Sequence, residues 1–314
     1  MTRLPSLISH TSLLAMVWVG GGLGAARLEA QFVQEGMKLA GSGFEWVSRS
    51  VALSADGGTA IVGGDGDYNN PGSLWVFTRS GVVWTQQAKL FGLGAEGYSM
   101  EGYSVALSAD GNTAIVGGPG DGDYKCVDCG YDGATWVLTR SGVVWTQQGS
   151  KGPVGAGTTI QDSKLVGSGA AGHASQGRSV ALSADGNTAI IGGSSDSGGA
   201  GAAWVFTRSG GVWTQQGAKL VGSGAIDAPS QGLSVALSAD GNTALVGGPG
   251  DTNFAGATWA YRRSGGVWNQ YGSKLVWQHG CCGRTARYFG SAVGRRQHGT
   301  LCWTGSRQRS MGVR

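Results

Sequence analysis

Short apolar strings separated by glycine-rich turns repeat along this chain. The string Ser-Val-Ala-Leu-Ser-Ala-Asp-Gly-Asn-Thr-Ala begins at Ser104, Ser179 and Ser234, and a near copy begins at Ser50, with Gly58 in place of Asn. A second string, Trp-Val-Phe-Thr-Arg-Ser-Gly, follows each copy in intact or slightly varied form. A repeat of this kind is one supersecondary unit that cannot bury its apolar face alone, so neighbouring units must stack.

Each copy predicts four short β-strands. In the third copy they are Ser179–Ser183, Thr188–Gly193, Trp204–Arg208 and Val212–Gln216, which are rich in β-branched and aromatic residues. Asp-Gly-Asn predicts a hairpin turn, because Gly and Asn tolerate a positive φ. No segment keeps the 3.6-residue apolar period of a helix. Four short strands in a unit of about 40–55 residues predict an all-β chain of β-propeller blades.

The repeat period changes once along the chain. Counted from Ser54, the serine before Ala-Asp-Gly recurs after 54, 75 and 55 residues. The long interval contains seven extra residues between Gly117 and Trp136 and thirteen between Trp145 and Leu165. We expect both insertions to be loops between strands, where added length costs little stability.

One segment of the second copy carries a family resemblance. Residues Gly102–Leu107 read Gly-Tyr-Ser-Val-Ala-Leu, and Thr113–Pro119 ends in Gly-Gly-Pro where the FG-GAP repeat has Gly-Ala-Pro. The chain therefore resembles the FG-GAP family, whose repeats build integrin-type α-chain propellers and many bacterial surface proteins. The Phe of the Phe-Gly pair is replaced by Glu101, Gln176 and Gln231. The resemblance implies a propeller that binds partners, without a shared chemistry.

The chain divides into three parts. Residues 1–30 predict a secretory signal peptide, with the positive charge of Arg3, an apolar core over residues 13–19 and small residues before a cleavage site. Residues 31–276 are the FG-GAP-like propeller repeats, and no apolar run within them is long enough to cross a bilayer. We therefore expect a secreted or cell-surface protein.

Residues 277–314 form a tail without the repeat. Permitted codons for Val293–Leu301, read one base later, spell Ser-Ala-Asp-Gly-Asn-Thr-Ala-Leu, and this reading begins 55 residues after Ser238. We interpret the tail as frame-shifted and expect it to be disordered.

The tail also accounts for the basic charge of the chain. It contains seven Arg and no acidic residue, whereas the whole chain has 23 basic and 19 acidic residues and a net charge of +4. Without the tail the balance is about −3, so the charge gives no support for a nucleic-acid partner.

The number of repeats is too small for a closed seven-bladed ring. Phe32–Leu39 resembles Val212–Leu220, the last strand of a copy, and would complete a blade formed from the other end of the chain. Seven copies would need about 385 residues, and propellers have roughly 4–8 blades. Four in-frame copies therefore predict an open, incomplete propeller whose exposed blade faces invite self-association.

Acidic loops are the candidate metal site. Asp65, Asp67, Asp121 and Asp123 follow the Val-Gly-Gly strands and are the best calcium ligands in the sequence; the alternative is a solvated loop. The Asp-Gly turns offer a single carboxylate each, so we expect them to be structural turns. These turn residues are Asp56, Asp110, Asp185 and Asp240.

Cysteine and glycine motifs give little chemistry. Cys126 and Cys129 form a Cys-x-x-Cys without a second ligand pair or a βαβ context, so we predict a loop disulfide. Gly167–Gly172 matches Gly-x-Gly-x-x-Gly, but no helix pattern follows it. We find no catalytic motif and expect no cofactor other than calcium.

Eight tryptophans recur at two positions of the repeat. They either stack on carbohydrate rings or pack between blades, and their strict period favours packing. They are Trp75, Trp136, Trp204 and Trp259 in the third strands and Trp84, Trp145, Trp213 and Trp268 in the fourth.

Three functions stay open at this point. The first is a binding or adhesion module that recognises a protein or glycan through its inter-strand loops. The second is an extracytoplasmic carbohydrate-active enzyme, which would need two carboxylates at glycosidase separation. The third is a fragment of a longer propeller protein without a function of its own.

Overall fold

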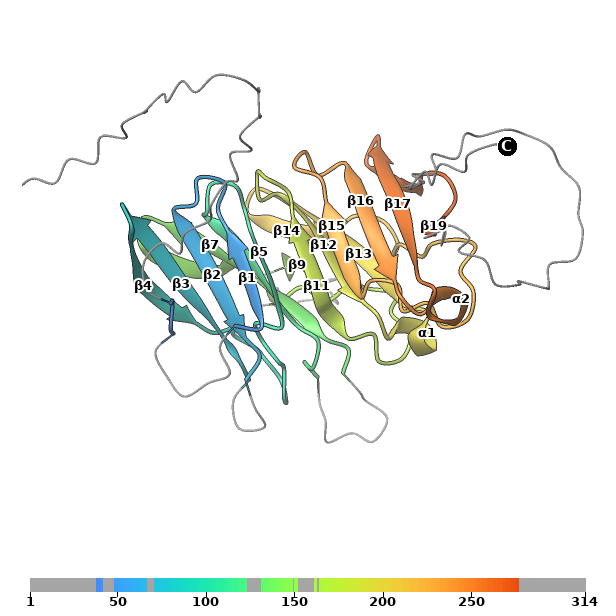
Figure 1. Ribbon diagram of the computed structural model, residues 1–314, viewed down its shortest axis with the longest axis horizontal. Helices are drawn as coiled ribbons and strands as arrows, with labels where there is room; N and C mark the ends of the chain where they lie inside the picture. The colour runs from blue at the N-terminus through green and yellow to red at the C-terminus, as the bar shows by residue number, and fades with distance from the viewer. Residues whose placement is uncertain are drawn as a thin grey trace, which may run out of the picture. The chain divides into compact units, whose positions relative to one another are not determined.

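The computed structural model describes residues 38–41, 48–66, 71–122, 131–148, 150–151, 161–162 and 164–276. The predictions for the signal peptide, residues 1–30, and for the tail, residues 277–314, lie outside these ranges. Within the described ranges the chain is all-β, and four antiparallel sheets follow one another along it (Figure 1). We name these sheets units one to four.

The strands of each unit hydrogen-bond in sequence order. Unit one contains β1 (Ser50–Leu53), β2 (Thr59–Gly64), β3 (Ser73–Ser80) and β4 (Val83–Leu90). Unit two contains β5 (Ser104–Leu107), β6 (Thr113–Gly118), β7 (Ala134–Ser141) and β8 (Val144–Gln148). Unit three contains β11 (Gln176–Leu182), β12 (Thr188–Gly193), β13 (Ala202–Ser209) and β14 (Val212–Gln215). Unit four contains β15 (Ser234–Leu237), β16 (Thr243–Gly248), β17 (Ala257–Ser264) and β18 (Val267–Gln270), with β19 (Leu275–Val276) paired to β17. These four-stranded units confirm the predicted propeller blades.

The second strand of units one to three is buried on both of its faces. In unit three, Ile190 pairs with Ala181 on one side and with Val205 on the other, and every residue of β12 is buried. Because the sheet is covered on both sides, this strand reads as a continuous apolar run instead of an alternating one.

The core lies between successive units. Ile61 and Val76 of unit one pack with Val116 and Leu138 of unit two, and the next two interfaces repeat this arrangement. Each fully buried side chain of this size contributes roughly 1.5–3 kcal/mol. The third-strand tryptophans are all completely buried, which confirms a packing role for them. Trp204 and Trp259 lie in the interfaces between units, and Trp75 lies in a separate cluster on unit one.

Glycine is required where two units approach most closely. A Cβ on Gly117 would meet the carbonyl oxygen of Gly177 in unit three well inside contact distance, so no larger residue fits. The hydroxyl of Ser104 donates to the same carbonyl at 2.8 Å. The glycines of the Val-Gly-Gly strands therefore permit unit-to-unit contact, which is a different role from the turn glycines.

Both ends of the set of units expose apolar side chains. Leu245 in β16 is 40% exposed, whereas its counterparts in units one to three are completely buried. Val51 and Leu53 of β1 are 70% and 57% exposed. A groove of about 680 Å³ on unit four is lined in part by Leu245, Leu275 and Val276. Unit four therefore has a partly uncovered blade face, as expected for an incomplete propeller, whereas in unit one the exposure is confined to β1, since Val62 and Trp75 are buried.

Two local features differ from the sequence prediction. The second insertion is not only a loop: β9 (Ser150–Lys151) and β10 (Gln161–Asp162) pair with each other, and β9 joins the sheet of unit three beside β14. Two short helices, α1 (Asp196–Gly199) and α2 (Asp251–Phe254), follow β12 and β16. Four-residue helices are too short to produce a periodic signal in the sequence.

No helix within the described ranges combines the length and the apolar character that spanning a membrane requires.

Candidate binding surface on the loop face

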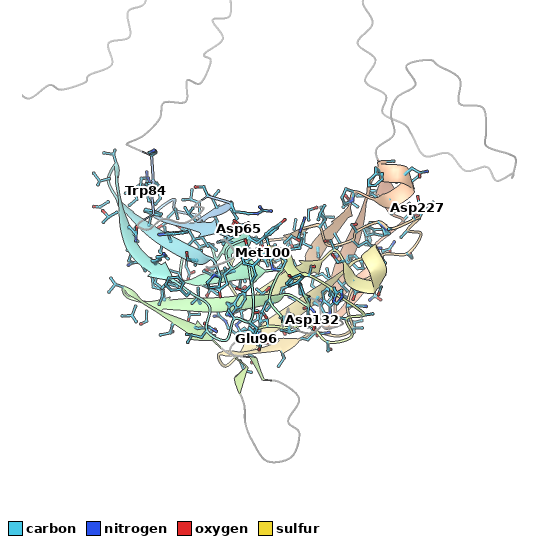
Figure 2. The ribbon with its side chains drawn as sticks, turned by 90° about the horizontal axis from the view of Figure 1, so that it is seen from below. Asp65, Trp84, Glu96, Met100, Asp132 and Asp227 are labelled. Atoms are coloured by element: carbon cyan, nitrogen blue, oxygen red, sulfur yellow. The ribbon has the colours of Figure 1, made fainter. Side chains whose placement is uncertain are left out.

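Two sets of loops meet at one end of the units. In units two to four, a backbone hydrogen bond joins the loop after the second strand to the loop that enters the same unit, as in Gly120 N to Ser99 O at 3.2 Å and Gly250 N to Pro229 O at 3.1 Å. We name this surface the loop face, and Figure 2 labels Asp65, Glu96, Asp132 and Asp227 on it. Its described residues are 48–49, 65–66, 71–72, 91–103, 119–122, 131–133, 166–178, 194–201, 221–233 and 249–256.

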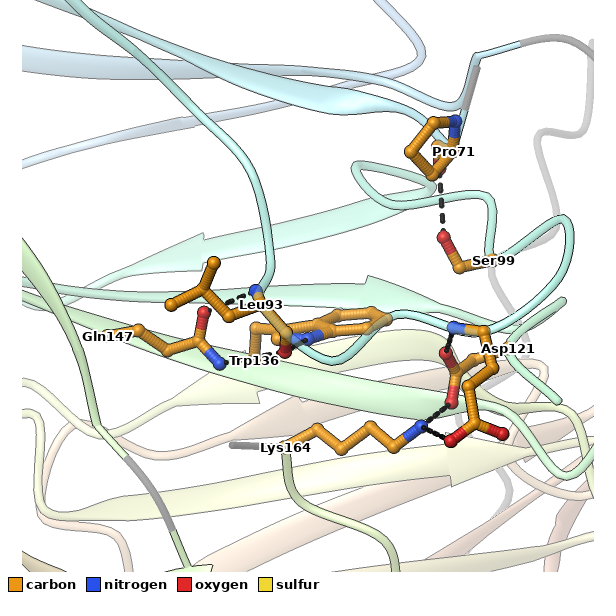
Figure 3. A network of polar contacts seen from close by, with 8 residues as sticks. Pro71, Leu93, Ser99, Asp121, Trp136, Gln147 and Lys164 are labelled. Carbon is orange, nitrogen blue, oxygen red and sulfur yellow. Dashed lines mark hydrogen bonds and ion pairs between the residues drawn. The ribbon is translucent and has the colours of Figure 1, made fainter. Parts of the chain in front are cut away.

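A buried aspartate anchors the loops of unit two. Lys164 Nζ lies 2.6 Å from Asp121 Oδ2, and the backbone N–H of Glu96 donates to Asp121 Oδ1 at 2.8 Å (Figure 3). Glu96 is in the loop that enters the unit, and Lys164 is in the segment that leaves it. One carboxylate therefore holds three segments together, with both of its oxygens engaged.

The same anchor recurs in units three and four. Asp196 and Asp251 pair with Lys219 and Lys274 at 2.6 and 2.5 Å. Each carboxylate also accepts a backbone N–H from the entering loop at 2.8 Å. Truncating one partner would leave a buried charge uncompensated, which is strongly destabilising. These ion pairs were not predicted from the sequence. A signal for them was present, because each of these copies has an Asp three residues after its Gly-Gly and ends in a Lys-Leu.

A second clamp holds the entering loops at the position where the FG-GAP family has Phe. Gln176 accepts the N–H of Gly167 at 2.5 Å and donates to its carbonyl at 2.9 Å, and Gln231 clamps Gly222 in the same way. Both glutamines are completely buried. The clamp therefore satisfies the backbone of the loop where water is excluded.

Glu101 replaces the clamping glutamine in unit two. Its Oε2 accepts the N–H of Gly92 at 2.6 Å, but its buried Oε1 has no hydrogen-bond partner among the described residues. Burial raises the pKa of Glu101 to about 8, the Gly92 hydrogen bond opposes this rise, and the charge of Asp121 adds to it. A protonated Glu101 has one O–H donor and one acceptor oxygen, which correspond to the one donor and one acceptor that Gln176 uses toward Gly167.

The predicted calcium ligands are only partly within the described residues. Asp65 Oδ2 lies 3.1 Å from Arg49 Nη1, and Asp121 is held by Lys164. Burial raises the pKa of Asp121, against the hydrogen bond from Lys164. The other two ligands, Asp67 and Asp123, are outside the described ranges, as are Cys126 and Cys129 of the predicted disulfide. The described part of the chain contains no cluster of three metal-ligating side chains. The calcium site and the disulfide stay predictions.

The Asp-Gly turns, which lie at the opposite end of the units, have a structural role. Asp110 Oδ1 accepts the Ser108 hydroxyl at 2.5 Å and the Asn112 N–H at 3.0 Å, and Ser108 Oγ accepts the Thr113 N–H. In the first copy, the hydroxyl of Ser54 lowers the pKa of Asp56. These local bonds close the turn and confirm the predicted turn role.

The loop face also presents exposed apolar side chains. Phe254 is 88% exposed, Leu93 is 67% exposed and Ile226 is 50% exposed. Thr252, Asn253 and Phe254 have φ values of 50°, 51° and 65°, a left-handed turn that costs energy for residues other than Gly. The anchor at Asp251, whose Oδ2 accepts the Thr252 hydroxyl at 2.9 Å, holds this turn in place.

The fold and this surface define an all-β protein built of propeller-type blades whose loop face is held by buried ion pairs and hydrogen bonds. No family model and no curated protein matches the chain. Among solved structures, it is similar to TolB from Acinetobacter baumannii, with 12% identity and a TM-score of 0.37, over 72% of this chain and 43% of that one. It is also similar to Kuenenia stuttgartiensis hydrazine synthase, with 14% identity and a TM-score of 0.43, over 78% of this chain and 53% of that one. This chain thus spans about half the length of either structure, and neither similarity bears on function.

Proposed function

We propose that the chain is a secreted or cell-surface binding module, of the adhesion type found in the FG-GAP family, that recognises a protein or glycan through its loop face. The observation that carries the proposal is a set of loops held rigid by buried ion pairs while apolar side chains project from them. Preorganised loops lose little entropy on binding, and variable loops on a rigid scaffold are where specificity usually resides.

Phe254 is the best-placed contact residue on this surface. An aromatic side chain that is 88% exposed on a strained, anchored turn is stabilised by no packing within the described residues. Strained backbone persists only where the surroundings enforce it, and it concentrates at functional sites. Aromatic residues also dominate the binding energy of protein interfaces and stack on sugar rings.

The enzyme alternative has less support. A glycosidase needs one carboxylate as acid and another as base or nucleophile. Four carboxylates of the described loop face, at Asp65, Asp121, Asp196 and Asp251, are each paired with a cation, which leaves Asp132 and Asp227 as the aspartates that this alternative would have to use. The fragment alternative is supported by the uncovered face of unit four, which has the composition of an interface between units.

The test uses the full chain against an array of extracellular proteins and glycans. We expect Phe254→Ala to lose most of the binding to a captured ligand while its melting temperature stays within about 1–2 °C of wild type. The matched control is Val143→Ala, because Val143 is 72% exposed in the turn between β7 and β8, at the opposite end of the units. Equal binding by both variants, or no ligand on the array, would contradict the proposal.

A further inference from the structure

The first strands of the four units lie side by side, and the residue before each opening serine forms a row at the loop face. β5 contacts β1 and β11, and β11 contacts β15. The hydroxyl of Ser50 donates to Gly102 O of the next unit at 2.8 Å, and Ser179 repeats this bond one unit further on. The row consists of Arg49, Tyr103, Arg178 and Leu233.

Two guanidinium groups of the row share one aromatic ring. The guanidinium carbon of Arg49 lies 3.8 Å from the centroid of the Tyr103 ring, and that of Arg178 lies 4.8 Å from it. Arg49 precedes the first strand of unit one, Tyr103 that of unit two, and Arg178 lies in unit three, so one ring contacts cations from both neighbouring units. Stacking on the ring fixes the plane of each guanidinium and shields one of its faces from water.

Among the residues that the structure describes, Arg49 has a carboxylate partner and Arg178 has none. Asp65 lies 3.1 Å from Arg49, where its side chain is 14% exposed. Asp65 follows Gly-Gly in unit one, and Ser194 occupies the same position of the repeat in unit three. Among the described residues, no acidic side chain pairs with Arg178. The guanidinium of Arg178 is therefore held against Tyr103 and lies near the cation of Arg49. It has no counterpart of Asp65, the carboxylate that neutralises Arg49.

We propose that Arg178, oriented by Tyr103, binds a carboxylate side chain of an acidic peptide segment in the partner protein. The Asp65–Arg49 pair shows that a peptide carboxylate fits a guanidinium at this position of the repeat. Guanidinium and carboxylate match geometrically and form paired charge-assisted hydrogen bonds. Leu233, the next residue in the row, gives the segment an apolar neighbour. This assignment rests on the proposed binding function and specifies the chemistry of its ligand.

The probe is a fluorescein-labelled peptide of four Gly-Asp repeats, with a Gly-Asn peptide as the uncharged comparison. Fluorescence polarisation of the full chain at low ionic strength, where such contacts are least screened, measures affinity. We expect Arg178→Gln to weaken Gly-Asp binding about tenfold, in line with the loss of a hydrogen bond to a charged group. Asp65→Asn should strengthen binding, because it releases Arg49.

The controls separate this site from general electrostatics and from the loop face. Arg262 is exposed outside the row, so Arg262→Gln should bind like wild type. Unchanged affinity in Arg178→Gln, no gain in Asp65→Asn or equal binding of the Gly-Asn peptide would overturn the proposal. So would binding of oligogalacturonate without binding of the Gly-Asp peptide. If Phe254→Ala still loses its array ligand while Arg178→Gln does not, the carboxylate site fails and the binding function stands.

Discussion

The clamp position of unit two predicts a pH-dependent stability that comes from one residue. Glu101 is 1% exposed, its Oε1 has no partner in the described structure, and the equivalent residues in units three and four are glutamines. We expect the folded chain to hold a proton on Glu101 at neutral pH, because an ionised carboxylate there is both desolvated and near Asp121.

The size of the effect follows from linkage. The pKa of Glu101 rises from an ordinary value of 4.5 to about 8 on folding. Between these two values the folded state binds a proton that the unfolded state has released, so stability falls as pH rises through this window and levels off above about pH 8. At 1.36 kcal/mol per pH unit, the loss is roughly 5 kcal/mol as an upper value, since local opening and water entry reduce it.

The assay compares wild type with Glu101→Gln by urea unfolding from pH 5 to pH 9. Near pH 5 the two proteins should have similar free energies of unfolding, because protonated glutamic acid and glutamine are both neutral and both have a donor and an acceptor. Near pH 9 the variant should be more stable by a few kcal/mol. Titrating groups that do not interact with residue 101 cancel in the difference between the two proteins, whereas Asp121 interacts with Glu101 and contributes to the difference.

A mirror variant tests the same reasoning from the opposite direction. Gln176→Glu places the acid at the equivalent position of unit three, and it should introduce the same kind of pH slope into that unit. A difference between Glu101→Gln and wild type that stays constant from pH 5 to pH 9 would refute the argument. Equal destabilisation by Glu101→Gln at both ends of the range would show that the carboxyl group has another partner.

Three further predictions concern the blades. Trp204→Ala should destabilise the chain by about 3–5 kcal/mol, because it leaves a cavity at a completely buried site. The loss is measured as a lower midpoint of urea unfolding, and a midpoint equal to that of wild type would contradict the packing role. Gly177→Ala should lower the melting temperature by several degrees, because its Cβ would collide with the backbone of unit two and its φ is 84°. The control is Gly81→Ala, whose Cβ would meet no atom within 4 Å, so that it tests the positive φ alone. Equal effects of the two variants would refute the close-contact argument. Leu245→Asp should reduce concentration-dependent association in sedimentation velocity, because it places a negative charge on the exposed apolar face of unit four. If the variant associates as wild type does, the contact between chains lies elsewhere.

Local structure was predictable from the sequence because it depends on neighbouring residues. The four strands per copy follow from apolar and β-branched runs, and the turns follow from bonds such as Ser108 to Asp110, two residues apart. The buried tryptophans follow from their period. Each of these features is repeated in every copy, so the pattern is visible without knowledge of the partner that packs against it.

The loop face was decided by tertiary structure. Asp121 looked like a calcium ligand in a solvated loop, but Lys164, 43 residues away, lies against it in the fold. In the sequence Glu101 is a departure from the glutamine of the third and fourth copies, and only the fold shows that it is buried, which raises its pKa to about 8. The Arg49–Tyr103–Arg178 row brings together three units. Charge and burial depend on which residues the fold brings close together, and a repeated local pattern contains no information about that distance.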